Sequence, residues 1–219
     1  YSGNELRRRQ YLAGMNIEDL ELILHPMVEE AKEAVGSMGD DTPTAVLSDQ
    51  YRPLSHFFRQ NFSQVTNPPI DSLRENEVMS LKTRFGNTGN ILDLENLTKD
   101  NIYVLESPVL SNSQFEKFYD FFKKNVKFLD CTFDINEGLK QKLDKLRNEA
   151  EIAVREGGKH LILSDREINE KKAPIPMVLA IGAINSRLSN LGIRGFASIN
   201  VQTGEVLDTH SFAVLLGVG

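Results

Sequence analysis

The chain has 219 residues, of which 40% are hydrophobic, and a formal net charge of −6 from 31 acidic and 25 basic residues. This length and apolar fraction are enough for a packed core, whereas the acidic balance disfavours a nucleic-acid surface or an anionic membrane as partner. No apolar run approaches the roughly 20 residues that a membrane-spanning helix needs. A single cysteine, Cys131, excludes an internal disulfide and favours a reducing compartment, for which we expect the cytoplasm.

The two ends of the chain are unusual for a complete protein. It begins at Tyr1 and stops at Gly219, just after the apolar run 212–216. Natural C-termini usually trail off into polar, poorly ordered residues. We therefore expect residues 1–219 to be a single domain cut from a longer polypeptide.

Helical signals open the chain. Asn16 is placed to cap a helix whose apolar residues follow helical spacing. Pro26 is expected to interrupt that helix, and a second helical stretch should then run to Val35 and stop at Gly36.

The region up to residue 100 is irregular. Phenylalanine spacing predicts an amphipathic helix over 54–65, and two consecutive prolines exclude a helix in 66–70. A short helix is expected over 71–80, and 84–100 reads as a loop. Residues 1–100 thus resemble a wrapping segment of irregular helices.

Strands and helices alternate from residue 101 onward. Strands are expected at 102–105, 126–129, 160–163, 196–201 and 212–216, with helices at 113–122, 136–156 and 176–191. Repeated strand–helix–strand order with unbroken apolar strands is typical of a mostly parallel sheet covered by helices, so we predict an α/β fold. An exposed final strand at 212–216 would also permit self-association of the chain.

One polar cluster could form a site. Ser164, Asp165, Arg166 and Glu167 directly follow a predicted strand, where α/β proteins place functional groups. A stand-alone enzyme or ligand-binding domain would use this strand end. The alternative is an Arg–Asp pair that only caps the strand.

The other candidates indicate structural roles. Cys131 has Asp130 and Asp134 close by, which would raise its thiol pKa, so we interpret it as buried packing. The segment Gly36–Pro43 lacks the lysine of a P-loop, and its paired aspartates would repel phosphate, which favours a turn. The histidines have no metal-ligand spacing: His25, His56, His160 and His210. We assign no catalytic residue and no metal ligand.

Two neighbouring regions carry a specific resemblance. The first is Gly36–Pro43 followed by Ala45–Ser48, and the second spans Arg52–Leu54, Phe57–Gln60, Gln64–Asp71 and Arg74–Glu75. Together they are similar to the central domain of the large subunit of glutamate synthase. The similarity continues through Asn90–Leu92, Leu161–Arg166 and His210–Gly217.

That family has a distinctive organisation. A glutaminase domain with an N-terminal cysteine nucleophile releases ammonia, which crosses a tunnel to an FMN-binding barrel and forms L-glutamate from 2-oxoglutarate. The central domain joins these two domains and is similar to a rudimentary copy of the barrel. The resemblance therefore implies an incomplete TIM-barrel-like fold with both catalytic domains as partners in the same polypeptide. FMN and an iron–sulfur cluster would be held outside this chain, which alone should be inactive.

The resemblance places Thr66, Asn67 and Ile70 in the wall of the ammonia tunnel. Ammonia is small and easily protonated, so a conduit needs rigid walls and little bulk water. The prolines between Asn67 and Ile70 supply rigidity, Ile70 supplies an apolar surface, and Asn67 supplies an amide able to hydrogen-bond a neutral amine. The alternative is that this segment is merely a stiff turn.

The sequence departs from the family pattern in two places. Histidines are expected in the helix where this chain has Ala183–Leu188, and a pair of histidines where it has His210 and Ser211. We therefore predict that these positions are not catalytic. Two competing interpretations remain: a stand-alone enzyme with its site at Ser164–Glu167, and a pure scaffold with no role in channelling.

Overall fold

The structure of the chain is a computed structural model that describes residues 3–31, 42–43, 45–49, 51–59, 80–86, 92–93, 95 and 102–219. The chain forms two compact units, of which the larger comprises Tyr1–Asn61 and Asn125–Gly219 and the smaller Phe62–Lys124. The larger unit holds a parallel sheet with its helices. Among its described residues, the smaller unit holds two antiparallel strands and one helix.

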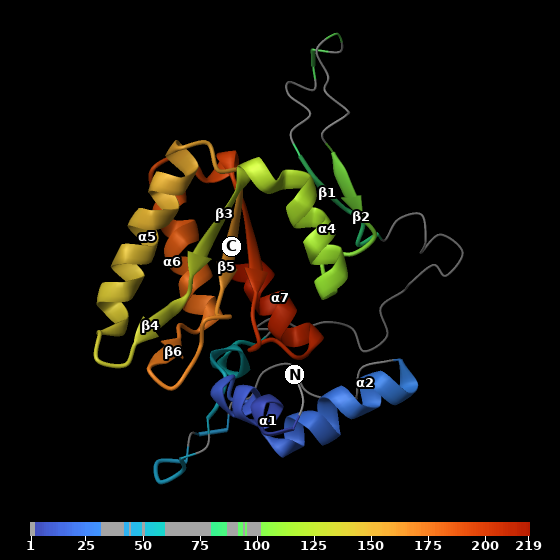
Figure 1. Ribbon diagram of the computed structural model, residues 1–219, viewed down its shortest axis with the longest axis vertical. Coiled ribbons are helices and arrows are strands. Elements are labelled where there is room, and N and C mark those ends of the chain that lie inside the picture. Colours follow the sequence, from blue (N-terminus) through green and yellow to red (C-terminus); the bar gives the residue numbers. More distant parts are fainter. Residues whose placement is uncertain are drawn as a thin grey trace. The chain divides into compact units, whose positions relative to one another are not determined.

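The core of the larger unit is a three-stranded parallel sheet (Figure 1). Its strands are β3 (Val126–Asp130), β5 (His160–Ser164) and β7 (Ser198–Gln202), with β5 in the centre. Val126 pairs with His160, and His160 pairs with Ser198. The predicted α/β class and the parallel pairing are confirmed.

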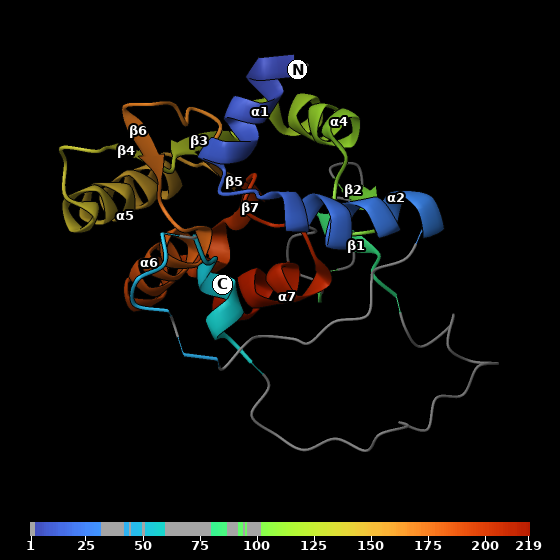
Figure 2. The same ribbon diagram turned by 90° about the horizontal axis from the view of Figure 1, so that it is seen from below.

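Helices α5 (Leu139–Arg155) and α6 (Met177–Asn190) connect these strands and lie on the same side of the sheet (Figures 1 and 2). Leu161 and Leu163 of β5 belong to the core between the sheet and these helices. Because side chains alternate along a strand, Ile162 lies on the opposite face of the sheet. All three are fully buried. Burial on both faces explains the unbroken apolar sequence of this strand.

The turn from α5 into β5 requires two glycines. Gly157 has a φ of +89°, a left-handed conformation that glycine adopts without strain. A Cβ on Gly158 would lie 2.7 Å from the carbonyl oxygen of Ala153, which leaves no room for a side chain. The predicted end of this helix at the Gly–Gly pair is confirmed.

A small ribbon beside the sheet was not predicted. Strands β4 (Thr132–Asp134) and β6 (Lys172–Pro174) pair antiparallel at the carboxyl end of β3. The helix expected from residue 136 starts only at Leu139, because Asn136 closes a turn by donating its amide to Asp134 Oδ1 at 2.8 Å.

The predicted final strand at 212–216 is wrong. These residues lie in helix α7 (Thr209–Val218), which begins where Asp208 accepts a hydrogen bond from the Ser211 amide at 2.8 Å. The buried positions Ser211, Val214 and Leu215 follow helical spacing. An apolar run of five residues fits a buried strand or a buried helix, and the Asp208 cap decides the outcome. Because residues 212–216 form a helix, the predicted route to self-association through a strand at this position is lost.

Pro26 does not interrupt its helix as predicted. Asn16 and Asp19 exchange backbone and side-chain hydrogen bonds of 2.9 and 3.0 Å, which confirms the cap. A π-helical segment, η1 (Asp19–Leu24), then passes directly into α2 (His25–Glu30). Proline lacks an amide hydrogen, and a wider turn just before it accommodates the lost hydrogen bond.

Two further N-terminal elements complete the larger unit. Helix α1 spans Gly3–Leu12. A helix is expected over 54–65, and of that range only residues 54–59 are described: they form the 3-10 turn η2 (Leu54–Phe57), after which Phe58 is extended. Helix α2 ends at Glu30, because the next residue, Ala31, has a φ of +52° and leaves the helical conformation. The helix therefore does not run unbroken to Val35 as expected. Residues 32–41 and 60–79 lie outside the described residues.

The smaller unit is held together by aromatic rings. Strands β1 (Thr83–Phe85) and β2 (Tyr103–Leu105) pair antiparallel, and α4 (Asn112–Phe122) begins with a capping box between Ser111 and Gln114. Phe118 of α4 lies 4.9 Å from the Phe85 ring and 6.0 Å from the Tyr103 ring. The predictions of β2 and α4 are confirmed, whereas β1 lies where a loop was expected.

The Asp208 cap provides a test of α7. Replacing Asp208 with alanine removes the acceptor for the Ser211 amide and should lower the free energy of unfolding by about 0.5–2 kcal/mol. Asp208→Asn keeps a side-chain oxygen at the same place and should retain most of the stability. Urea unfolding followed by circular dichroism measures both variants, and equal losses for the two would contradict the cap.

Candidate functional site

The predicted polar cluster lies where expected, at the carboxyl ends of β5 and β7. Ser164 Oγ donates to Gln202 Oε1 at 3.2 Å. Asp165 Oδ2 accepts a hydrogen bond from the Thr203 hydroxyl and another from the Gly204 amide at 3.2 Å. These side chains are directed at β7 and the turn that follows it, where they fasten two strand ends together.

Arg166 and Glu167 do not join them. Both are exposed in the turn after β5. Within the described residues Arg166 forms no ion pair, so the Arg–Asp pair considered for this strand end is not formed. Of the four predicted residues, Ser164 and Asp165 therefore bond to the neighbouring strand end, whereas Arg166 and Glu167 face solvent.

A second carboxylate, Glu205, connects three segments that are far apart in sequence. Its Oε2 accepts the backbone amide of Met177, the first residue of α6, at 2.8 Å, and its Oε1 accepts the Tyr51 hydroxyl at 3.3 Å. A carboxylate at a helix N-terminus also stabilises the helix dipole. The Tyr51 ring in turn covers Gly14, whose φ is +75° and where a Cβ would lie 2.4 Å from the ring.

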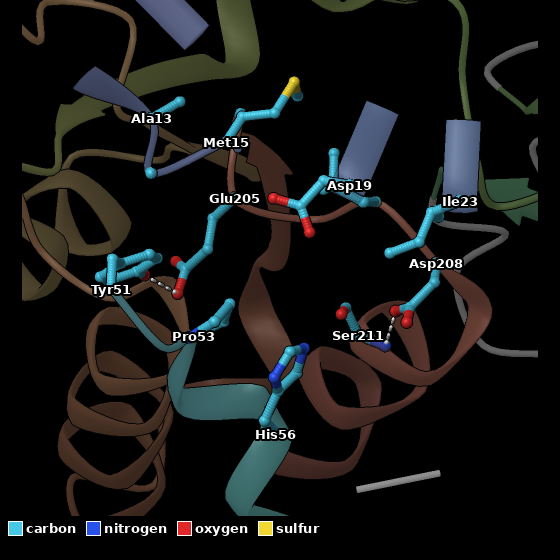
Figure 3. Close-up of a pocket in the computed structure, with 13 residues that line it drawn as sticks. Ala13, Met15, Asp19, Ile23, Tyr51, Pro53, His56, Glu205, Asp208 and Ser211 are labelled. Atoms are coloured by element: carbon cyan, nitrogen blue, oxygen red, sulfur yellow. Dashed lines mark hydrogen bonds between the residues drawn. The ribbon is translucent and has the colours of Figure 1, made fainter. Parts of the chain in front are cut away.

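These segments enclose a small pocket next to Glu205 (Figure 3). Figure 3 shows the side chains of Glu205, Asp19 and His56 around it, with the Asp208–Ser211 cap at one side. Its volume of about 20 Å³ is sufficient for a single water molecule. A pocket of this size cannot hold a metabolite or a nucleotide cofactor.

Burial controls the titration of both carboxyl groups. Burial raises the pKa of Asp165, although the hydrogen bonds from Thr203 and Gly204 oppose it. Burial likewise raises the pKa of Glu205, with the Asp165 charge adding to the effect. Burial and then the Glu205 carboxylate raise the pKa of Tyr51 well above its ordinary value. The junction of Tyr51, Asp165 and Glu205 therefore favours protonated groups.

Cys131 is fully buried, as predicted. Burial raises the pKa of its thiol to about 12, and the charges of Asp130 and Asp165 contribute to the shift. From the sequence, Asp130 and Asp134 are expected to raise this pKa. In the structure the two carboxylates that do so are Asp130 and Asp165. A protonated thiol is a poor nucleophile and a poor metal ligand.

The histidines are far apart in the chain and serve different purposes. His160 is buried at the start of β5, with Nδ1 at 2.7 Å from Ser198 Oγ. His210 Nε2 donates to the Ser55 carbonyl at 2.9 Å, which ties α7 to η2. His25 Nε2 lies 3.3 Å from an oxygen of Glu29, and His56 lines the small pocket.

Neither of the two departures from the family pattern lies in an open site. Ala183 and Ile184 are buried in α6. Ser211 is buried and lies 3.4 Å from Ser55 through their hydroxyls. These contacts assign packing and anchoring roles to both positions.

Several predicted positions have no structural description. Thr66, Asn67 and Ile70 lie outside the described residues, as does most of Gly36–Pro43. In the part of the chain that is described, no cluster of three or more His, Cys, Asp or Glu side chains is arranged to hold a metal. Over the same residues, no helix is both long enough and apolar enough to cross a membrane.

Sequence reasoning missed the Tyr51–Glu205 contact. Glu205 follows strand β7 just as Asp165 follows β5, so the logic of strand ends could have identified it. Tyr51 lies 154 residues away in a turn-rich segment, and no sequence pattern connects the two.

Comparison with known proteins identifies the family. The family model described as "Glutamate synthase central domain" matches residues 8–219. The chain belongs to the glutamate synthase central domain family.

Its curated relatives are glutamate synthases. Over 98% of its length the chain is 56% identical to "Glutamate synthase [NADPH] large chain" of Azospirillum brasilense. It is 39% identical over 99% of its length to the protein of the same name from Bacillus subtilis. It is 41% identical over 97% of its length to "Ferredoxin-dependent glutamate synthase, chloroplastic" of rice, Oryza sativa subsp. japonica. The chain spans 13–14% of the length of these relatives.

Glu205 should make the stability depend on pH. Because its pKa is raised above the ordinary 4.5, the folded protein holds this proton where the unfolded chain has lost it, so stability declines as pH rises from about 4.5. Glu205→Gln should weaken that decline in urea unfolding measured across pH. The ion-paired Glu151, whose pKa is lowered, gives the matched control. Its stabilising contribution is present above 4.5 and is lost as pH falls below that value, so Glu151→Gln should lower stability at neutral pH and change the pH slope only on the acidic side of 4.5, with opposite sign. Identical pH profiles for the two variants would contradict this assignment.

His160 should act in the opposite direction. Burial and the nearby Lys159 charge lower its pKa from 6.5 to about 4. Between these values the unfolded chain binds the proton and the folded protein does not, so stability increases as pH rises from about 4 to 6.5. His160→Gln should remove this increase. If the variant keeps the wild-type slope in that range, another group causes it.

Proposed function

We propose that this chain is the central linking domain of a glutamate synthase and couples two reactions without performing either. The proposal is carried by one observation: the family match covers residues 8–219, while the chain spans only 13–14% of relatives that are all named glutamate synthases. In this proposal a glutaminase domain and an FMN-binding synthase domain of the same polypeptide are its partners. The whole enzyme makes L-glutamate from L-glutamine and 2-oxoglutarate.

The connectivity of the sheet supports an incomplete TIM-barrel-like fold. Strands β3, β5 and β7 lie side by side in chain order, and both connecting helices cover the same face. A (β/α)₈ barrel repeats this unit around a closed sheet, whereas a doubly wound sheet places helices on both faces. We infer that the domain uses part of a barrel as a rigid support.

The organisation of the carboxyl edge agrees with a supporting role. Ser164, Asp165 and Glu205 are hydrogen-bonded to their own strand ends and to α6, and the adjoining pocket holds one water-sized molecule. An enzyme site at Ser164–Glu167 would need these groups to face a substrate. The chain's own cysteine also does not fit an iron–sulfur cluster, which needs several thiolates. We therefore place the cluster and FMN in other parts of the polypeptide.

The tunnel is the specific element of the proposal. We infer that Thr66, Asn67 and Ile70 form part of its wall, because the segment resembles the one that lines the tunnel in this family. The stiffness that the intervening prolines give supports this role. Location in the cytoplasm remains a prediction from the single cysteine. The rice relative named above is chloroplastic, so location varies within the family.

The tunnel prediction is tested in the intact enzyme. Asn67→Ala or Ile70→Ala should loosen the wall without removing a catalytic group, so ammonia should escape. The ratio of glutamine hydrolysed to 2-oxoglutarate converted should rise while glutaminase activity persists. Parallel assays of glutamate formation and glutamine consumption give this ratio.

Two controls make the result interpretable. Asn148→Ala changes an exposed asparagine of α5 and should leave the ratio at its wild-type value. Thermal unfolding of each variant detects a loss of stability, for which about 1–2 kcal/mol is usual. Variants that fold normally and keep the wild-type ratio would reduce the segment to a stiff turn.

A further inference from the structure

An open groove of about 410 Å³ lies at the amino ends of β5 and β7. It is at the opposite end of the sheet from Asp165 and Glu205. Its walls come from the end of α5, the Gly157–Gly158 turn into β5, and the segment between α6 and β7. All of these elements belong to the larger unit.

The groove has a rigid apolar lining. Val154 is 8% exposed, and Ile193 packs against the main core, so neither can turn away. Phe196 is 70% exposed, although removing such a large apolar side chain from water is favourable. The glycine turn contributes no side chains, and Gly158 has no room for one. The hollow is therefore built into the backbone.

The rim of the groove is positively charged in a chain whose net charge is −6. Of its two cationic lining residues, Arg155 shares the single carboxylate Glu151 with Arg187 of α6, which does not line the groove; the N···O distances are 2.9 and 2.8 Å. Lys159 is exposed, and no carboxylate of the described residues lies within ion-pair distance of it. One further lysine at this end, Lys127, is balanced by Glu156 at 3.2 Å.

We propose that this groove is the docking surface for a segment of the same polypeptide outside these 219 residues. The segment presents a large apolar side chain to Phe196 and Ile193, with Asp or Glu beside it for Lys159 and Arg155. The inference rests on the proposed function, since it requires further domains. An apolar centre with a charged rim has the anatomy of a protein interface, and the amino ends of such strands serve stability and assembly while catalytic groups gather at the carboxyl ends.

Site-specific photo-crosslinking in the full-length polypeptide tests the proposal. A benzophenone amino acid replaces Phe196, and in a matched control it replaces Ile152, which is 55% exposed on α5 and does not line the groove. After irradiation, mass spectrometry maps the crosslinked peptides. Position 196 should give crosslinks to one segment beyond residues 1–219 that contains Asp or Glu near the attachment point, and position 152 should not reach that segment.

Charge variants complete the experiment. Lys159→Glu places like charges together and should lower the yield at position 196 about fivefold or more, while Lys159→Arg should keep it. If Lys159→Glu does not fold, Lys159→Met replaces it and should also lower the yield. Crosslinks to a second copy, to another protein or to no single segment would overturn the proposal, as would a yield that ignores the charge at 159. Failure of the tunnel element of the proposed function would instead appear as an unchanged product ratio in the tunnel variants, which this experiment does not measure.

Discussion

Strand β5 has neighbours on both edges and buried side chains on both faces, and the rest of the larger unit is arranged around this constraint. Backbone groups buried this deeply must be hydrogen-bonded, so β3 and β7 must align with β5 in fixed register. Leu161 and Leu163 require cover on one face, which α5 and α6 provide. Both connections must then cross on the same side, and that determines where each strand end and each loop lies.

The carboxyl edge shows how the fold deals with polar groups at its centre. Asp165 and Glu205 lie partly buried, where an ionised carboxylate is costly, and every hydrogen bond they accept comes from neighbouring loops or α6. The cost appears as raised pKa values. At the other end of β5, burial has the opposite consequence for His160, whose pKa is lowered. The same cause thus makes two ends of one sheet respond to pH in opposite directions.

Sequence patterns predicted those parts of the fold in which local and tertiary preferences agree. Strand β5 is recognisable because Leu161–Leu163 form an unbroken apolar run, and β3 because three of the four residues Val126–Leu129 are apolar. Helix α6 is recognisable because its apolar residues agree with the flanking proline and glycine. The run 212–216 was misassigned because five apolar residues carry no period of their own, and the decisive signal was Asp208, upstream of the run. The predicted break at Pro26 is wrong because a π-helical segment directly before the proline accommodates the missing hydrogen bond, so the chain stays helical.

The candidate site was predictable only in part, for a related reason. Strand ends locate groups such as Asp165, because topology brings the carboxyl ends of parallel strands together. Whether those groups face a ligand or each other depends on their partners. Tyr51 and Met177 reach Glu205 from 154 and 28 residues away, and these distances leave no trace in sequence spacing.

Helix α7 carries apolar residues on its exposed side as well as on its buried side. Its residues are apolar around the whole circumference: Val214 and Leu215 are buried, while Phe212 is 37% and Leu216 is 72% exposed. A helix that is apolar on all sides is typical of one that is covered on all sides. Among the described residues, only the inner side of α7 is covered, and Phe196 is exposed at the amino edge of the sheet. Exposed apolar surfaces of this kind are costly in water and often mark sites of interaction. On the proposed function, both surfaces would be covered by other parts of the polypeptide, since the chain spans 13–14% of its relatives' length.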